Sequence, residues 1–207
     1  MDGVLVDGEP LHFATVNELL GREGKSISLE QYKPYMGTKT GWADMIADFG
    51  LSQPREYYSP VYRELVLARY QRESQALPGA LSLVTALRMG GQKLGLASSS
   101  IRPWVEACLQ RIGLANAFDI TVTGTEIENG KPDPEIYLLT AERLGVAPSE
   151  CLAVEDAPAG IESAKAAGMT VWAVRTEYTR SLPLPNPARE FESLADVDIR
   201  DILGVTA

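Results

Sequence analysis

The sequence predicts an α/β protein built on a doubly wound parallel sheet, with an α-helical domain inserted near the N-terminus. From Pro78 onward, short apolar runs alternate with helical patterns, which is typical of a parallel sheet covered by helices on both faces. Between residues 12 and 76, by contrast, the sequence contains helical patterns and no convincing strand. We therefore expect a core domain, residues 1–11 and 77–207, and a helical cap domain, residues 12–76.

The elements of the core are read from apolar runs and from helical spacing with capping residues. The expected strands are Leu94–Ala97, Ile120–Thr123, Leu152–Val154 and Val171–Val174. The expected helices follow Pro78–Gly79, cover Val105–Ile112 and end at Gly113, begin at Asp133–Pro134 and end near Gly145, and run from about Ala159 to Gly168. A weaker helical stretch lies at Ile199–Leu203.

The cap domain is expected to hold further helices. Apolar residues at helical spacing lie between Trp42 and Phe49, directly before Gly50. Ser59–Pro60 predicts the start of another helix, because serine caps helix N-termini and proline is favoured at the first helical position.

Composition and charge exclude several classes of function. The chain has 207 residues with 19 Lys+Arg against 28 Asp+Glu, so its net charge of −9 argues against non-specific nucleic-acid binding. No apolar run approaches the roughly 20 residues of a membrane span, and the first ten residues lack the basic end of a signal peptide. Two cysteines and one histidine are too few for a disulfide framework or a Cys/His zinc cage. We expect a cytoplasmic protein whose metal would be hard and bound by oxygen.

Four polar clusters follow predicted strands, where open parallel sheets place their ligand sites: Asp2–Asp7, Ala97–Ser100, Gly130–Pro134 and Val154–Gly160. Taken one at a time, most of these clusters have an ordinary explanation as a turn, a helix cap or a solvated lysine. The adjacent carboxylates Glu155 and Asp156 repel each other and favour a bound cation. Together the clusters supply what phosphoryl transfer needs: carboxylates for Mg²⁺, a lysine and a hydroxyl for phosphoryl oxygens, and an acid for the leaving group.

The motifs DGVLVD, ASSS, GKPDPEIY and VEDAPAGIESAKAAG, in this order, resemble those of the haloacid dehalogenase superfamily. More narrowly, they are similar to the branch of β-phosphoglucomutase-like phosphatases with a helical cap. The resemblance covers nearly the whole chain. It implies a doubly wound parallel sheet with the cap inserted after the first motif.

The resemblance implies catalytic roles for residues of the first three motifs. Asp2 matches the general acid and base, which protonates the departing oxygen and then deprotonates the attacking water. Ser98 matches the hydroxyl that binds a phosphoryl oxygen, and Ser99 is expected beside it as a further substrate contact. Lys131 matches the cation that neutralises the nucleophile and the phosphoryl group.

A Mg²⁺ site and a specificity loop are implied as well. Asp156 matches the direct metal ligand, Glu155 a ligand that binds directly or through water, and Asp2 a ligand through its backbone carbonyl. In the cap loop, Lys39 is expected as a substrate contact. Sugar phosphomutases of the family tend to carry an arginine where this chain has Thr40, which weakens the mutase interpretation.

The implied function is that of a Mg²⁺-dependent phosphatase acting on small phosphorylated metabolites, such as sugar or polyol phosphates, through an aspartyl-phosphate intermediate. A phosphosugar mutase of the β-phosphoglucomutase type is the alternative with the same chemistry. A non-catalytic phosphate-binding protein is the alternative from another class. We expect a monomer whose partner is the small metabolite itself, with no nucleic acid or membrane involved.

The attacking aspartate of the family lies two residues before the general acid, and therefore directly before Met1. We expect the chain to be preceded by an apolar strand that ends in this aspartate. In the family's sheet that strand lies between the strands predicted at Leu94–Ala97 and Leu152–Val154. Without it, backbone groups of both neighbouring strands would lack ladder partners.

Overall fold

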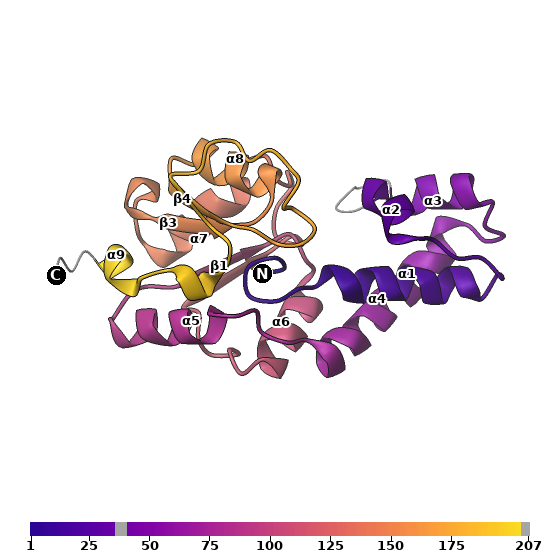
Figure 1. Cartoon of the computed structure of the whole chain (residues 1–207), viewed down its shortest axis with the longest axis horizontal. Helices are drawn as coiled ribbons and strands as arrows, with labels where there is room; N and C mark the ends of the chain where they lie inside the picture. Colours follow the sequence, from indigo (N-terminus) through magenta and orange to yellow (C-terminus); the bar gives the residue numbers. More distant parts are fainter. Residues whose placement is uncertain (36–40, 204–207) are drawn as a thin grey trace. The chain divides into compact units, whose positions relative to one another are not determined.

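The computed structural model describes residues 1–35 and 41–203 and divides the chain into two compact units (Figure 1). The core unit comprises Met1–Asp7 and Ser74–Ala207, and the helical unit comprises Gly8–Glu73. The boundaries expected from the sequence lie after residues 11 and 76. In the structure, helix α1 (Glu9–Gly21) begins directly after Gly8, so residues 8–11 belong to the helical unit.

The core unit is an α/β structure in which the described strands pair in parallel, so the predicted fold class is confirmed. Its strands are β1 (Gly95–Ser98), β2 (Ile120–Thr123), β3 (Leu152–Glu155), β4 (Thr170–Val174) and β5 (Arg189–Phe191). Its helices are α5 (Ala80–Met89), α6 (Arg102–Arg111), α7 (Glu135–Leu144), α8 (Pro158–Ala166) and α9 (Ile199–Leu203), with short 3₁₀ turns at Pro148–Glu150 and Leu194–Asp196. Strand β5 was not predicted, because two of its three residues are charged and exposed.

The described strands form two sheets, β1 beside β2 and the order β3, β4, β5. Strands β1 and β3 are therefore both edge strands within the part of the chain that the structure describes. A cavity of about 490 Å³ lies between them, lined by both strands, by Met1 and Leu5 and by residues of α5 and α7.

Helices α7 and α8 cover the sheets and bury the main apolar core. Helix α7 packs against β1 and β2, and α8 packs against β3 and β4. Gly95 of β1 allows α7 to approach closely, since a Cβ there would lie 2.6 Å from the Thr140 methyl group. Each large aliphatic side chain buried here contributes about 1.5–3 kcal/mol relative to exposure. The buried cluster consists of Val122, Ile136, Tyr137, Ala153, Ile161, Ala164, Ala167, Val171 and Ala173.

The helical unit contains α1, α2 (Leu29–Tyr32), α3 (Gly41–Phe49) and α4 (Arg55–Glu73). A 3₁₀ turn at Lys33–Tyr35 directly follows α2. Helices α1 and α4 are joined by His12, whose Nδ1 and Nε2 lie 2.6 Å and 3.1 Å from the hydroxyls of Tyr62 and Tyr70. Among the described helices of the chain, none is long and apolar enough to cross a membrane. The buried apolar cluster of this unit comprises Val16, Leu20, Ile27, Tyr32 and Met45.

The helix start predicted at Ser59–Pro60 was wrong, because α4 begins at Arg55 and Pro60 lies inside it. The buried Tyr58 fixes the earlier start. Its hydroxyl accepts a hydrogen bond from the Gln53 backbone N–H at 3.0 Å and donates one to Glu23. These contacts stabilise the helical turn before Pro60, which has no backbone N–H and therefore cannot donate a hydrogen bond within the helix.

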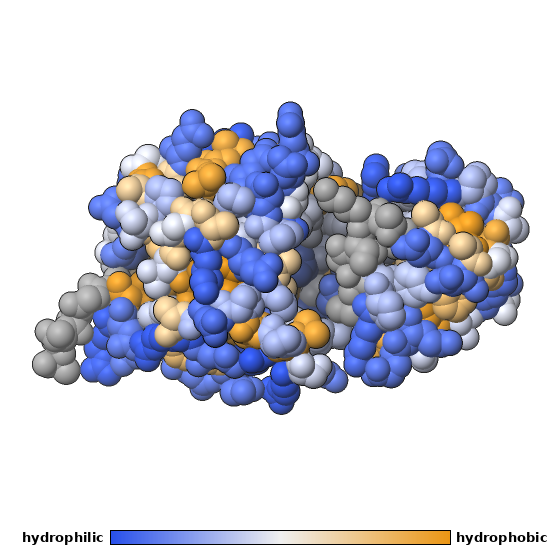
Figure 2. Space-filling model, turned by 90° about the horizontal axis from the view of Figure 1, so that it is seen from above, coloured by the Kyte–Doolittle hydropathy of each residue, from blue (hydrophilic) through white to orange (hydrophobic). Residues whose placement is uncertain are grey.

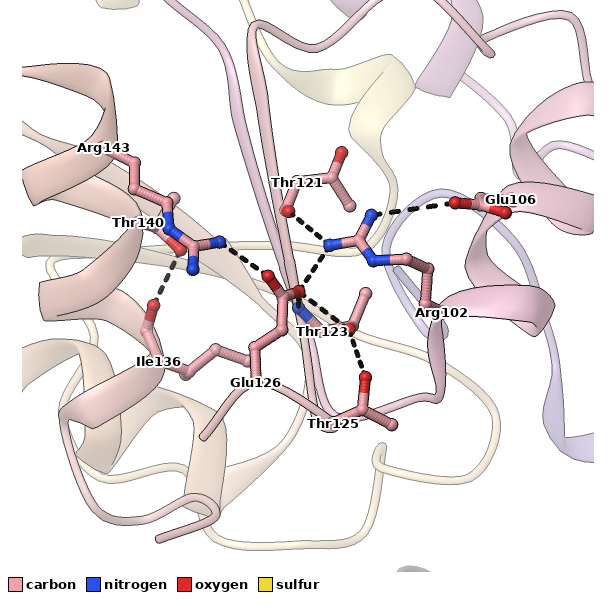
Figure 3. Close-up of polar contacts among 9 residues, drawn as sticks. All are labelled: Arg102, Glu106, Thr121, Thr123, Thr125, Glu126, Ile136, Thr140 and Arg143. Atoms are coloured by element: carbon pink, nitrogen blue, oxygen red, sulfur yellow. Dashed lines mark hydrogen bonds and ion pairs between the residues drawn. The ribbon is translucent and has the colours of Figure 1, made fainter. Parts of the chain in front are cut away.

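One carboxylate, that of Glu126, ties strand β2 to α6 and α7 (Figure 3). Its Oε1 accepts hydrogen bonds from the N–H and the hydroxyl of Thr123, both at 2.9 Å, and from Arg102 of α6. Its Oε2 accepts a hydrogen bond from Arg143 of α7 at 2.6 Å. The Arg143 bond, together with those of Thr123 and Arg102, lowers the pKa of Glu126 to about 2.

Replacing Glu126 with glutamine should therefore destabilise the core at neutral pH. A carboxylate with a depressed pKa stabilises the fold above its ordinary value of 4.5, and this contribution is lost as the pH falls toward 2. We expect Glu126→Gln to lower the free energy of unfolding by about 1–2 kcal/mol at pH 7, measured by urea titration, with a smaller difference below pH 4.

The matched control is Glu106→Gln. The Glu106 side chain is 65% exposed and lies 3.8 Å from Arg102, a surface pair worth about 0–1 kcal/mol. Equal losses in the two variants, or a loss for Glu126→Gln that does not depend on pH, would contradict this explanation.

Candidate active site

Glu155, the last residue of β3, is buried and is held by a lysine and a tyrosine. Its Oε1 accepts hydrogen bonds from Lys131 Nζ and from the Tyr137 hydroxyl. The Lys131 and Glu155 side chains are only 14% and 8% exposed. Although burial favours the neutral acid, the charge of Lys131 and the hydrogen bonds hold the pKa of Glu155 below its ordinary value. Burial and the Glu155 charge raise the pKa of Tyr137, so its hydroxyl remains a donor.

The loop before α7 holds Lys131 in place. The Glu135 carboxylate accepts hydrogen bonds from the backbone N–H groups of Glu128 and Asn129 at 2.9 Å and 2.8 Å. On the other side of Lys131, Ser163 of α8 donates to the Asp133 carbonyl at 2.6 Å. The lysine is thus anchored on both sides, with its ammonium group directed at the end of β3.

Glycines shape the space around the two acidic residues. Gly160 of α8 lies against Glu155, and Gly3 lies against Asp156, so closely that a Cβ at either position would overlap the carboxylate. Gly3 also has φ +74°, which disfavours any other residue. The turn that follows Asp2 is therefore packed directly on Asp156.

The carboxyl group of Asp156 has a raised pKa. Burial, followed by the negative charge of Glu155, raises the pKa of Asp156 to about 7, and the charge of Asp2 acts in the same direction. A cation at this position would offset both effects.

The turn after β1 reaches the same region. Ser98, which ends β1, is buried, and its Oγ accepts a hydrogen bond from the Ser100 N–H at 3.2 Å. The Ser100 hydroxyl donates to Asp2 Oδ2 at 3.0 Å. Ser99, between them, is exposed. The structure thus brings the second cluster of the sequence against the first.

The donor set favours a hard divalent cation. Asp156, the Asp2 carbonyl and Glu155 all offer oxygen ligands. Lys131 and Tyr137 donate to Glu155 Oε1, whereas Oε2 accepts the Asp156 N–H at 3.3 Å and retains a lone pair for direct or water-mediated contact. The described residues contain no group of three or more His, Cys, Asp or Glu suited to a metal. Mg²⁺ commonly takes one or two carboxylates and completes its shell with water and substrate phosphate, so these residues fit Mg²⁺ rather than zinc.

Two residues of the predicted specificity loop cannot be placed at this site, and two residues that contact the acidic cluster were not predicted from the sequence. Lys39 and Thr40 lie outside the described residues. Tyr137 and Ser100 were given no role at the acidic cluster from the sequence. Tyr137 stands six residues after Lys131 in the GKPDPEIY motif, but its contact with Glu155 has no local signal. Ser100 could be interpreted only as a helix cap, because its partner Asp2 lies 98 residues away.

The chain is similar to several characterised proteins. Residues 1–168 match the family described as haloacid dehalogenase-like hydrolase. The chain is 44% identical over 185 residues to hexitol phosphatase A of Escherichia coli K12, covering 84% of this chain and 80% of that protein. It is 32% identical over 176 residues to the fructose-1-phosphate phosphatase of the same organism, covering 84% and 93%. The structure of CbbY from Rhodobacter sphaeroides in complex with phosphate matches with a TM-score of 0.85 at 26% identity, covering 95% of this chain and 92% of that one.

Removing the Lys131 charge should cost far more stability than removing an exposed lysine. Lys131→Met leaves the buried Glu155 carboxylate without its counter-ion, and we expect the free energy of unfolding to fall by about 3–5 kcal/mol. In the double variant Lys131→Met/Glu155→Gln, the buried charge is gone and part of the loss should be recovered.

Lys93→Met is the matched control, because the exposed Lys93 donates to the Leu144 carbonyl and not to a buried carboxylate. Its loss should stay near or below about 1 kcal/mol. Chemical denaturation of the four proteins measures these differences. A double variant no more stable than Lys131→Met would show that the buried charge is not the cause.

Proposed function

The chain belongs to the haloacid dehalogenase-like hydrolase family and is a phosphoric monoester hydrolase, and we propose that its substrates are small sugar or polyol phosphates. The observation that carries the proposal is the partly buried Lys131, fixed by the buried Glu155 next to Asp156 at the end of β3. A lysine held in this way offers a positive charge to phosphoryl oxygens at a site that also favours a cation. Relatives named as phosphatases of hexitol phosphates and fructose 1-phosphate support this substrate class.

In the proposed reaction, an aspartate directly before Met1 attacks phosphorus and forms an aspartyl phosphate. The bond to the alcohol oxygen breaks, and Asp2 gives that oxygen its proton. The Asp2 carboxylate then takes a proton from water, which attacks the aspartyl phosphate and releases inorganic phosphate.

The remaining residues bind and orient the phosphoryl group. Ser98 and Lys131 would hold its oxygens, with Ser99 and Lys39 as further substrate contacts. Asp156, the Asp2 carbonyl and Glu155 would hold Mg²⁺, which when bound neutralises charge on the phosphoryl oxygens.

We further propose that the enzyme is a cytoplasmic monomer whose partner is the small metabolite. Hydrophobic residues are interspersed with hydrophilic ones on the face shown in Figure 2. Both cysteines are free thiols, Cys108 buried and Cys151 partly so, as expected in a reducing compartment. The large apolar side chains exposed among the described residues are spread over α4, α5, α7 and the segment between β4 and β5: Tyr57, Leu81, Met89, Leu138 and Leu182.

Replacing Asp156 with alanine should abolish Mg²⁺-dependent turnover in the full-length protein, because the site then lacks its direct carboxylate ligand. Phosphate release measured against Mg²⁺ concentration checks this. Asp198→Ala is the control, since the exposed Asp198 pairs with Arg200 and should be dispensable for turnover. Wild-type turnover by Asp156→Ala at ordinary Mg²⁺ concentrations would remove Asp156 from the metal site.

A substrate panel separates the phosphatase from the mutase. We expect phosphate release from fructose 1-phosphate or hexitol phosphates without a bisphosphate activator, since Thr40 replaces the arginine that would clamp a second phosphate. An isomerisation assay on β-glucose 1-phosphate runs in parallel, and Asp156→Ala serves as the inactive control. Efficient isomerisation with negligible phosphate release would instead identify a mutase.

A further inference from the structure

We propose that Ser100 is a positioning residue for the Asp2 carboxylate, an inference that rests on the function proposed above. The Ser100 hydroxyl donates a hydrogen bond to Asp2 Oδ2 at 3.0 Å in a partly buried setting. The two residues lie 98 positions apart in the sequence, so only the folded unit brings them together. The bond reaches the carboxyl group that the mechanism uses as acid and base.

Ser100 is itself fixed through its backbone. Its N–H donates to the Ser98 hydroxyl at 3.2 Å, and its carbonyl accepts from the Gly124 N–H at 3.1 Å. A Cβ at Gly124 would overlap the Ser99 carbonyl, so the loop after β2 packs directly on the turn after β1. Glu126 holds that loop through Thr123. A hydroxyl anchored in this way can orient another group rather than follow it.

The bond has a chemical consequence for Asp2. The terminal torsion of an aspartate is soft, so a carboxyl group without a fixed partner samples many orientations. A donor on Oδ2 sets the plane of the group, and with it the direction in which the carboxyl presents its proton to the leaving group. Proton transfer depends on such alignment, whereas formation of the bond between the attacking aspartate and phosphorus does not.

Leaving groups of different acidity test this role in the full-length protein. An alkoxide leaving from fructose 1-phosphate needs the Asp2 proton, whereas p-nitrophenolate leaves without one. The ratio kcat/KM reports the first chemical step for both substrates. We expect Ser100→Ala to lower kcat/KM at least 10-fold for fructose 1-phosphate and less than 3-fold for p-nitrophenyl phosphate.

Three further variants support the assignment. Ser100→Thr keeps a hydroxyl and should restore most of the activity on fructose 1-phosphate. Asp2→Asn should show the same dependence on the leaving group, with a larger loss of kcat/KM. Adding Ser100→Ala to Asp2→Asn should cause no further loss, because both substitutions remove the same function. Ser82→Ala is the matched control, since the Ser82 hydroxyl donates to the Gly79 carbonyl at the exposed start of α5.

The outcomes separate this inference from the proposed function. Equal losses on both substrates would indicate a structural role and overturn it, as would a loss confined to KM, which would make Ser100 a substrate contact. Wild-type activity in Ser100→Ala would also overturn it. If Ser100→Ala does not fold, Ser100→Cys replaces it, with the same expectation. No phosphate release by the wild-type protein from either ester would overturn the proposed function itself.

Discussion

The buried ion pair between Lys131 and Glu155 is the interaction on which the rest of the site depends. A carboxylate buried at the end of β3 is costly unless it is paired and hydrogen-bonded. Lys131 and Tyr137 meet that requirement, and in doing so they draw the loop before α7 onto β3. Because such a pair adds little net stability compared with apolar side chains, its value lies in the fixed positive charge that it presents.

The parallel topology explains why residues so distant in sequence converge. Strands β1 and β3 each pair in parallel with a neighbouring strand, and Ser98 and Glu155 are the last residues of β1 and β3. The N-terminal turn closes on this edge through Gly3, whose lack of a side chain lets the backbone after Asp2 rest on Asp156. The resulting group combines one fixed cation with carboxylates that favour a second, bound cation.

The sequence was most informative where local chemistry decides the structure. Strands β1 to β4 were predicted because they are apolar runs buried inside the unit, whereas the exposed edge strand β5 carries no such signal. The predicted start of α4 was wrong because the contacts of the buried Tyr58 outweigh the preference of Ser59 for a helix N-cap. Motif spacing identified the acidic pair and Lys131, but the bonds of Tyr137 and Ser100 depend on how loops pack and have no counterpart in the local sequence.

In the proposed mechanism, a phosphoryl group and a cation bind at a single site, which is formed by Lys131, Ser98 and the carboxylates at the end of β3. Calorimetric titration of the full-length protein with inorganic phosphate, with and without Mg²⁺, tests this most directly. If the two ligands share a site, Mg²⁺ will tighten phosphate binding, and phosphate will tighten Mg²⁺ binding by the same factor. A phosphate affinity that is unchanged by saturating Mg²⁺ would contradict the claim.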